Sequence, residues 1–270
     1  PVATDAAAVS VLGSLRETDK CAIGAHLHPW VTPPHSEEVN RRNSYHCNLP
    51  ADLERAKLAV LTDAIADSFG FAPTIFKAGR YGFGASTLEA LKALGYRIDC
   101  SFVPHTNLGP DGGPDFRKAH TEPFWLDPQR SILEVPLTVG FFGKAMRLGP
   151  ALAGLFDDPR ALRLHLPGVL ARTGLVSRAR LSPEGQSAAE QCRLLDALVA
   201  CGQRTFSLTY HSPSLAPGHT PYVRSERDLA DFLRRIERVL THFTSRLGGR
   251  FTTLDAVYRD ACAGASARAA

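Results

Sequence analysis

Short apolar runs alternate with amphipathic stretches along most of this chain. The run at residues 21–27 is typical of a buried strand, whereas apolar side chains recur at helical spacing over residues 52–69. Repeated alternation of a strand and a helix favours βα units over a β-sandwich or a helix bundle. The pattern therefore predicts an α/β fold.

The same pattern predicts where the individual strands and helices lie along the chain. Strands are expected at residues 21–27, 74–78, 96–102, 133–139, 205–210 and 251–254. Helices are expected at residues 5–15, 52–69, 86–94, 188–200 and 226–246, with the side chain of Asp5 capping the first.

Two longer stretches interrupt this alternation. Residues 103–127 are rich in Gly, Pro, Asp and His, which predicts a long excursion loop, and loops of that length in a compact domain are usually functional or disordered. Residues 144–181 are rich in Leu, Ala and Arg and predict a mostly helical insertion whose arginines form a solvated face. Since neither a repeat nor a clear linker divides the chain, we expect a single domain over residues 1–270.

Composition excludes several classes of protein. The 270 residues are 44% apolar and 21% charged, which is too apolar for a disordered chain. The formal charge is +4, with the basic residues scattered, so there is no electrostatic reason to expect a nucleic acid or an anionic membrane as the main partner. A small anionic ligand remains compatible with this charge.

The cysteines and the apolar runs point to a reducing compartment. None of the six cysteines forms a C-x-x-C pair, which excludes a zinc knuckle or a dithiol redox motif. No run approaches the roughly 18 consecutive apolar residues of a membrane span, and the start lacks a basic-then-apolar signal. We therefore expect a cytoplasmic protein without a membrane span.

Polar residues with catalytic potential gather where the predicted strands end, which is where α/β proteins bind ligands. His26 and His28 are two residues apart on a strand, so both imidazoles face the same side and can reach one metal ion. His35 and His46, on the following loop, are further possible ligands. The alternative, in which no metal binds, is one buried and one surface histidine beside a packed Trp30.

The second predicted strand leads into a glycine-rich turn that carries Arg80 and Tyr81. Glycines let the backbone approach a ligand, and backbone N–H groups at a helix start suit an oxyanion. A guanidinium at a strand end can orient a carboxylate, and a surface ion pair is the alternative.

Two more polar positions follow on later strands. Asp99 lies inside an otherwise apolar strand, so it must be paired, and we expect Arg80 or a histidine as its partner. His211 ends another predicted strand and is suited to proton donation near neutral pH if an acid orients it. A purely structural role is the alternative for His211 and for His219 on the next loop.

Taken in order from Cys21 to Leu254, these features resemble the polysaccharide deacetylase family, or NodB-homology domain. The stretch from Gly24 to Pro29 is similar to its histidine motif, and Gly79-Arg80-Tyr81-Gly82 to its arginine motif. Asp99 corresponds to an acidic motif, and Leu208-Thr209-Tyr210-His211 approaches a final Leu-x-His motif.

The chain departs from the family pattern in three ways. A single residue, Leu27, separates the two histidines where the family usually has three, and no proline precedes Tyr81. Most importantly, no strand with two adjacent acids, one the catalytic base and one a metal ligand, precedes the histidine motif, since Asp5 reads as a helix cap. The resemblance therefore leads us to expect a chain that begins after the family's first strand.

The resemblance implies a distorted (β/α) barrel of about seven strands, incomplete at its N-terminus. It also implies hydrolysis of an N-acetyl group, or a related amide or ester, on an amino sugar of a bacterial polysaccharide or its precursor. His26 and His28 would hold a divalent metal, most often zinc. The implied roles of the other residues are as follows: His211 protonates the leaving amine, Asp99 tunes His211, Arg80 fixes the acid of the first strand, the backbone N–H of Tyr81 binds the oxyanion, and Trp30, Ser212 and His219 contact the sugar.

Two other functions compete with this one. A degenerate deacetylase-like domain would bind sugar or a partner without turnover. An amidohydrolase-type metallohydrolase also places H-x-H at a strand end, but it needs further histidines on strands, whereas His165 and His242 lie in helical context.

Overall fold

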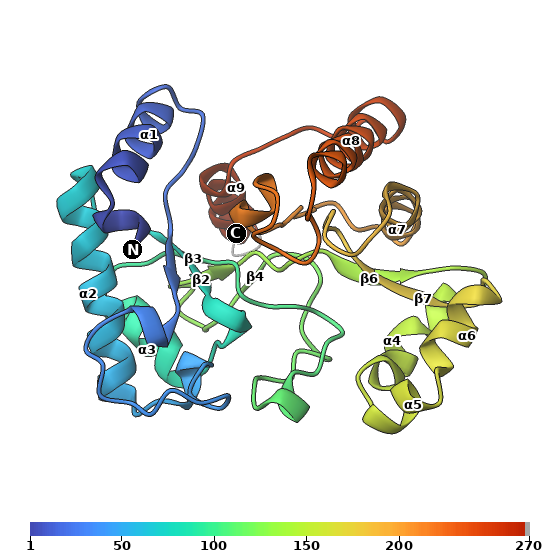
Figure 1. Cartoon of the computed structure of the whole chain (residues 1–270), viewed down its shortest axis with the longest axis horizontal. Coiled ribbons are helices and arrows are strands. Elements are labelled where there is room, and N and C mark those ends of the chain that lie inside the picture. Colours follow the sequence, from blue (N-terminus) through green and yellow to red (C-terminus); the bar gives the residue numbers. More distant parts are fainter. Residues whose placement is uncertain (268–270) are drawn as a thin grey trace. The chain divides into compact units, whose positions relative to one another are not determined.

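The structure is a computed structural model that describes residues 1–267 (Figure 1). The chain divides into two compact units, which are described in turn. Unit 1 holds residues 1–102, 107–115 and 123–136, and unit 2 holds residues 103–106, 116–122 and those from 137 onward. Both units mix helices and strands, so the predicted α/β class is confirmed, while the barrel stays a prediction.

Unit 1 is built on a five-stranded sheet with the order β1-β2-β3-β5-β4. Its strands are β1 (Ala25–Leu27), β2 (Ile75–Ala78), β3 (Ile98–Asp99), β4 (Phe124–Trp125) and β5 (Leu133–Glu134). The pairs β1–β2, β2–β3 and β3–β5 are parallel, and β4 is antiparallel to β5. The four predicted strands of this region are confirmed in shorter form, whereas β4 falls inside the stretch predicted as loop.

Three helices accompany this sheet: α1 (Ala6–Glu17), α2 (Ala51–Phe69) and α3 (Ala85–Ala93). The Asp5 carboxylate accepts a hydrogen bond from the Ala8 N–H at 2.8 Å, which confirms the predicted cap. Helix α2 ends at Gly70, where φ is +74°, a conformation that glycine adopts without strain. The core of the unit consists of fully buried apolar side chains, among them Leu27, Leu58, Phe76, Leu91 and Ile98.

Unit 2 contains a two-stranded antiparallel ribbon of β6 (Val139–Phe142) and β7 (Ser177–Arg180). The connection between these strands carries the short helices α4 (Gly149–Leu152), α5 (Pro159–Arg163) and α6 (Leu166–Arg172). The longer helices α7 (Ala188–Ala200), α8 (Glu226–Thr241) and α9 (Leu254–Ala267) follow. In the part of the chain that the structure describes, no helix is both long and apolar enough to cross a bilayer.

Three predictions for unit 2 are wrong in detail. The helical insertion predicted at 144–181 ends in strand β7, where Ala179 is buried between two arginines and pairs with Gly140. Residues 205–210 do not form the predicted strand. They contact other segments by isolated hydrogen bonds, such as that from the Thr209 N–H to Leu181 O at 3.1 Å. Residues 251–253 are irregular and Leu254 already begins α9, because Phe251 is exposed and no strand pairs with this segment within residues 1–267.

Candidate functional site

The carboxyl ends of the parallel strands of unit 1 lie at the same edge of its sheet. His26 and His28 stand at the end of β1, Arg80 follows β2, Asp99 ends β3 and Glu134 ends β5. This is the edge at which open α/β sheets bind their ligands. The candidate site of unit 1 is therefore built from four neighbouring strands.

The two histidines of β1 lie side by side, as predicted from their spacing. Their ring centroids are 4.6 Å apart, with the rings nearly perpendicular. His26 Nδ1 lies 2.8 Å from the carbonyl oxygen of Lys77 on β2. Because a carbonyl can only accept, Nδ1 carries the proton and the lone pair of the neutral ring lies on Nε2. Metal-binding histidines usually show this arrangement, in which a hydrogen bond at one nitrogen fixes the ring while the other binds the metal.

The donor set offered to a metal consists of these two imidazoles. Within residues 1–267, no group of three or more His, Cys, Asp and Glu side chains gathers closely enough to hold a metal ion. His46, predicted as a further ligand, is fully buried and bonded to Glu54 Oε1 at 2.7 Å, and Thr87 donates to the same oxygen at 2.5 Å. His46 is therefore part of a buried hydrogen-bond network with Glu54 of α2 and Thr87 of α3. His26 and His28 can fill two positions of a metal site.

Gly79 allows the end of β2 to lie against the histidine strand. A Cβ added there would lie 2.2 Å from the carbonyl oxygen of Leu27 and 2.6 Å from Nδ1 of His28. The backbone oxygen cannot move away without distorting β1. A glycine at this position therefore leaves room for the His28 ring against the end of β2.

Gly79→Ala is accordingly expected to destabilise the protein by about 1–3 kcal/mol, because the added methyl overpacks this contact. Gly13→Ala is the matched control, since a Cβ at this position in α1 meets nothing within 4 Å and alanine favours the helix. Denaturant unfolding measures both variants. Equal stability of the Gly79 and Gly13 variants would contradict the close approach.

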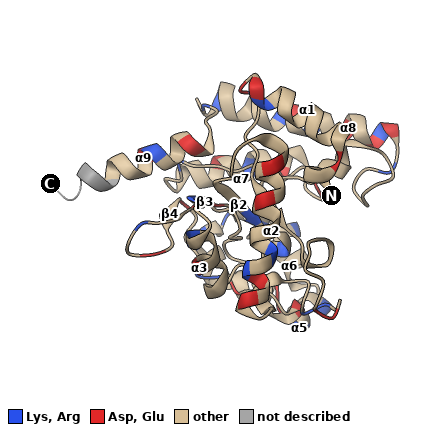
Figure 2. Ribbon diagram, turned by 90° about the vertical axis from the view of Figure 1, so that its left-hand side faces the viewer, with Lys and Arg blue, Asp and Glu red and all other residues tan. Residues whose placement is uncertain are grey.

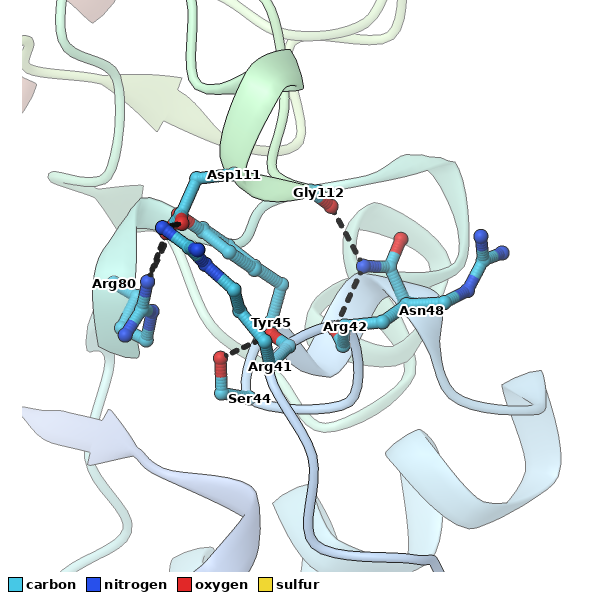
Figure 3. A network of polar contacts seen from close by, with 8 residues as sticks. All are labelled: Arg41, Arg42, Ser44, Tyr45, Asn48, Arg80, Asp111 and Gly112. Carbon is cyan, nitrogen blue, oxygen red and sulfur yellow. Dashed lines mark hydrogen bonds and ion pairs between the residues drawn. The ribbon is translucent and has the colours of Figure 1, made fainter.

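Arg80 belongs to a polar network that joins the turn after β2, the loop at residues 41–48 and the excursion loop at residues 111–112 (Figure 3). Its Nη2 pairs with Asp111 Oδ2 and donates to Tyr45 Oη at 3.2 Å, while Tyr45 Oη donates to the same Asp111 oxygen at 2.8 Å. Arg41 also forms an ion pair with Asp111. Next to it, the Nδ2 of Asn48 donates a hydrogen bond to the carbonyl oxygen of Gly112 at 2.8 Å. Although burial alone raises the pKa of Asp111, its hydrogen bonds from Tyr45 and Arg41 hold that pKa below its ordinary value.

This network corrects one prediction. The expected partner of Arg80 was Asp99 or an acid on a preceding strand, whereas its carboxylate partner is Asp111 in the excursion loop. Arg80 and Tyr81 also adopt φ values of +52° and +62°, a left-handed conformation that is costly for residues with a side chain. Two consecutive residues in this conformation directly follow β2, and such strain is often found at functional sites.

Asp99 is paired with a second acid that the sequence analysis missed. It is the register partner of Glu134 across β3 and β5, and both side chains are fully buried. Ser101 Oγ donates to Asp99 at 2.5 Å, and the Phe102 N–H donates to Glu134 at 2.9 Å. Burial raises the pKa of both carboxyls, and the negative charge of Asp99 raises that of Glu134 further. Both shifts favour the protonated form, so the pair holds a proton to higher pH than two isolated carboxyls would.

Trp30 lies beside the histidines at the start of the next loop. Its ring centroid is 4.6 Å from that of His28, and 40% of the residue is exposed. Trp30 is therefore packed against His28 on one side and is not buried. The exposed part of the ring is available for contact with a ligand.

In unit 2, His211 has a carboxylate partner that the sequence did not predict. His211 Nδ1 lies 2.7 Å from Glu184 Oε2, and the His211 N–H and Ser214 Oγ donate to Glu184 Oε1. The Glu184 side chain is 7% exposed, whereas that of His211 is 68% exposed. The acid that orients His211 is thus Glu184, and Asp99 pairs with Ser101 and Glu134 instead.

The charge of Glu184 is stabilised by these donors. Burial alone raises its pKa, but the hydrogen bonds from Ser214 and His211 outweigh burial and lower the pKa below its ordinary value. Together with Arg178, Arg180 and Tyr222, this pair lines a polar cavity of about 250 Å³. Ser212 and His219, the other predicted binding residues of this unit, are both exposed on the adjoining segment.

Glu184→Gln is expected to change the tautomer of His211. In the native protein the carboxylate holds the proton on Nδ1 of the neutral ring, whereas an amide can donate as well as accept. Nitrogen NMR of the histidine ring should show the Nδ1–H form in the native protein and a mixture in the variant. An unchanged spectrum would contradict the orienting role, and Glu190→Gln in α7 is the control.

No protein-family model matches the chain, and no curated protein matches it. The resemblance to polysaccharide deacetylases thus rests on the residues themselves.

Three acids of these networks were absent from the predicted site: Asp111, Glu134 and Glu184. Glu134 carried a usable signal, because it stands between Leu133 and Val135 in an apolar run, as Asp99 does in its own strand. Asp111 and Glu184 lie in loop sequences, where an acid is ordinary. Asp111 and Glu184 can be recognised as site residues only from their contacts in the folded protein.

Proposed function

We propose that this protein is a metal-dependent deacetylase that hydrolyses N-acetyl groups, or related amides or esters, on amino sugars of a bacterial polysaccharide or its precursor. The observation that carries the proposal is the pair His26 and His28, with Nδ1 of His26 bonded to the Lys77 carbonyl. The strained turn at Arg80 and Tyr81 follows the neighbouring strand. This combination supports the resemblance that the sequence shows.

His26 and His28 would hold the metal, and zinc is favoured because neutral imidazole is among its preferred ligands. A bound zinc ion supplies Lewis acidity, which polarises a carbonyl and lowers the pKa of water.

The other residues have roles that do not depend on the identity of the metal. We assign to the backbone N–H of Tyr81 the binding of the oxyanion, and to Trp30 a stacking contact with the sugar ring. For unit 2 taken by itself, we assign to His211 a role as proton donor, with Glu184 Oε2 2.7 Å from its Nδ1. Arg80 positions the turn through Asp111.

Release of acetate from N-acetylglucosamine oligomers, in the presence of zinc, tests this function. We expect release by the native protein, loss of release in His26→Ala/His28→Ala, and retention in His35→Ala, which alters an exposed loop histidine. No release from any N-acetylated oligomer or simple acetyl ester would overturn the proposal. Zinc and sugar binding without release would indicate a non-catalytic sugar-binding domain instead.

A further inference from the structure

The helices between β6 and β7 carry apolar side chains that the fold of unit 2 does not bury. Five large aliphatic residues in and around α5 and α6 are exposed, and Leu164 and Val169 are 69% and 52% exposed. The five are Leu162, Leu164, Leu166, Val169 and Leu175, and we call them the α5–α6 surface. They follow one another within 14 residues of the chain, and a contiguous exposed apolar patch commonly marks an interaction site.

The exposed aliphatic side chains take no part in the buried apolar cluster of this connection. Ala161 of α5 is buried, and Phe141, Ala153 and Val176 form an apolar cluster beneath the connection. Met146 and Phe156 pack against that cluster. The exposed leucines are therefore additional to what holds the connection together.

The charged residues within α5 and α6 are all basic. Arg160, Arg163 and Arg172 are exposed in the same two helices, and no Asp or Glu occurs from residue 159 to residue 183. The overall charge of +4 conceals this segment, because acids elsewhere balance it. In Figure 2 the basic residues are blue and the acidic ones red, and segments of both colours lie near the label α5.

The two nearest acids in sequence are engaged within unit 2. Asp157 forms two hydrogen bonds with the guanidinium of Arg178, at 2.6 and 2.9 Å. Asp158 caps α5 by accepting from the N–H groups of Arg160 and Ala161. The surface therefore presents aliphatic side chains and guanidinium groups together.

We propose that the α5–α6 surface docks on a lipid bilayer with anionic headgroups. Short helices with leucines and interspersed arginines are typical of segments that lie in the interface of a membrane, since arginine keeps its charged end among the headgroups while its stem lies along apolar surface. Each basic residue near an anionic surface adds to the attraction. The surface lacks the aromatic residues that dominate most protein interfaces, and a nucleic acid offers no counterpart for its leucines.

This docking is independent of the deacetylase activity and does not require a spanning helix. It would place unit 2 at a bilayer surface, where a lipid-linked glycan is presented.

Co-sedimentation with vesicles tests the proposal. The probes are vesicles of phosphatidylcholine alone and vesicles of phosphatidylcholine and phosphatidylglycerol in equal parts. We expect binding to the anionic vesicles, weakened at least about tenfold in Leu164→Ser/Val169→Ser and about tenfold in Arg163→Gln/Arg172→Gln. Leu233→Ser/Arg234→Gln on α8 is the control, because it removes the same residue types from another exposed surface and should bind normally.

Three outcomes would overturn the proposal. The first is no binding to anionic vesicles, and the second is equal binding to both kinds of vesicle. The third is a loss in the α8 control as large as in the α5–α6 variants. Sedimentation velocity shows whether the proposed variants change the mass of the protein in solution, and a loss of self-association would assign the surface to a second copy of the chain.

Discussion

Lys57→Met is expected to destabilise the protein by about 3–5 kcal/mol, because it leaves buried polar groups without their partner. Lys57 lies on α2 and is fully buried. Its Nζ donates to three backbone carbonyls, those of Pro29, Thr32 and Pro34, at 2.7–3.0 Å, and lies 2.9 Å from Glu37 Oε1. Removing the ammonium leaves these acceptors without the hydrogen-bond donor that they have in the native protein.

The effect of this variant reaches the candidate site. The carbonyls belong to the loop that follows His28 and carries Trp30, so Lys57 fixes that loop against α2. The fluorescence of Trp30 should therefore change together with the free energy of unfolding. A Trp125→Phe background isolates this signal from that of the second tryptophan.

Two further variants separate the buried charge from the packing. Lys57→Met/Glu37→Gln should recover part of the lost stability, because it removes the uncompensated carboxylate. Lys20→Met, at an exposed position, should change stability by less than about 0.5 kcal/mol. A Lys57→Met protein as stable as the Lys20 variant would contradict the role of this lysine.

Glu134→Gln is expected to make the protein more stable than the native chain at alkaline pH. Burial and the neighbouring Asp99 raise the pKa of Glu134 in the folded state, so it holds its proton to higher pH there than in the unfolded chain, where the ordinary pKa is 4.5. Above that pH, the stability of the native protein falls by about 1.4 kcal/mol per pH unit for each proton retained, until the pH reaches the raised pKa. A glutamine donates and accepts as the protonated acid does, without this dependence.

Denaturant titrations from pH 5 upward measure the difference between the two proteins, which should grow with pH. Glu89→Gln, on the exposed side of α3, should show no such trend. Glu134→Ala should be less stable at every pH, since it leaves the Phe102 N–H without its acceptor. A constant difference between Glu134→Gln and the native protein across the pH range would contradict the protonated pair.

Much of unit 1 could be predicted from the sequence because its signals are local. Apolar runs and helical spacing give the strands and helices, Asp5 gives a helix start, and the spacing of His26 and His28 puts both rings on one face. Gly70 ends α2 through its own backbone conformation, and Gly79 after β2 lets the backbone of β1 come close. These features depend on few residues, so a pattern can capture them.

The pairing of charges was less predictable because it depends on long-range contacts. Arg80 meets Asp111, which lies 31 residues further along the chain, and His211 meets Glu184, which lies 27 residues before it. The predicted strand at residues 205–210 failed for a related reason, since its apolar pattern was present but no neighbouring strand pairs with it in the described chain. Whole-chain charge likewise averaged out the basic segment around α5 and α6.

The central claim is that His26 and His28 bind a metal, and the metal content of the purified protein tests it most directly. Mass spectrometry of the native protein incubated with zinc and then desalted should show stoichiometric zinc, with loss of the metal in His26→Ala/His28→Ala and retention in His35→Ala. Zinc at the same level in the double variant as in the native protein, or no retained metal in the native protein, would contradict the account.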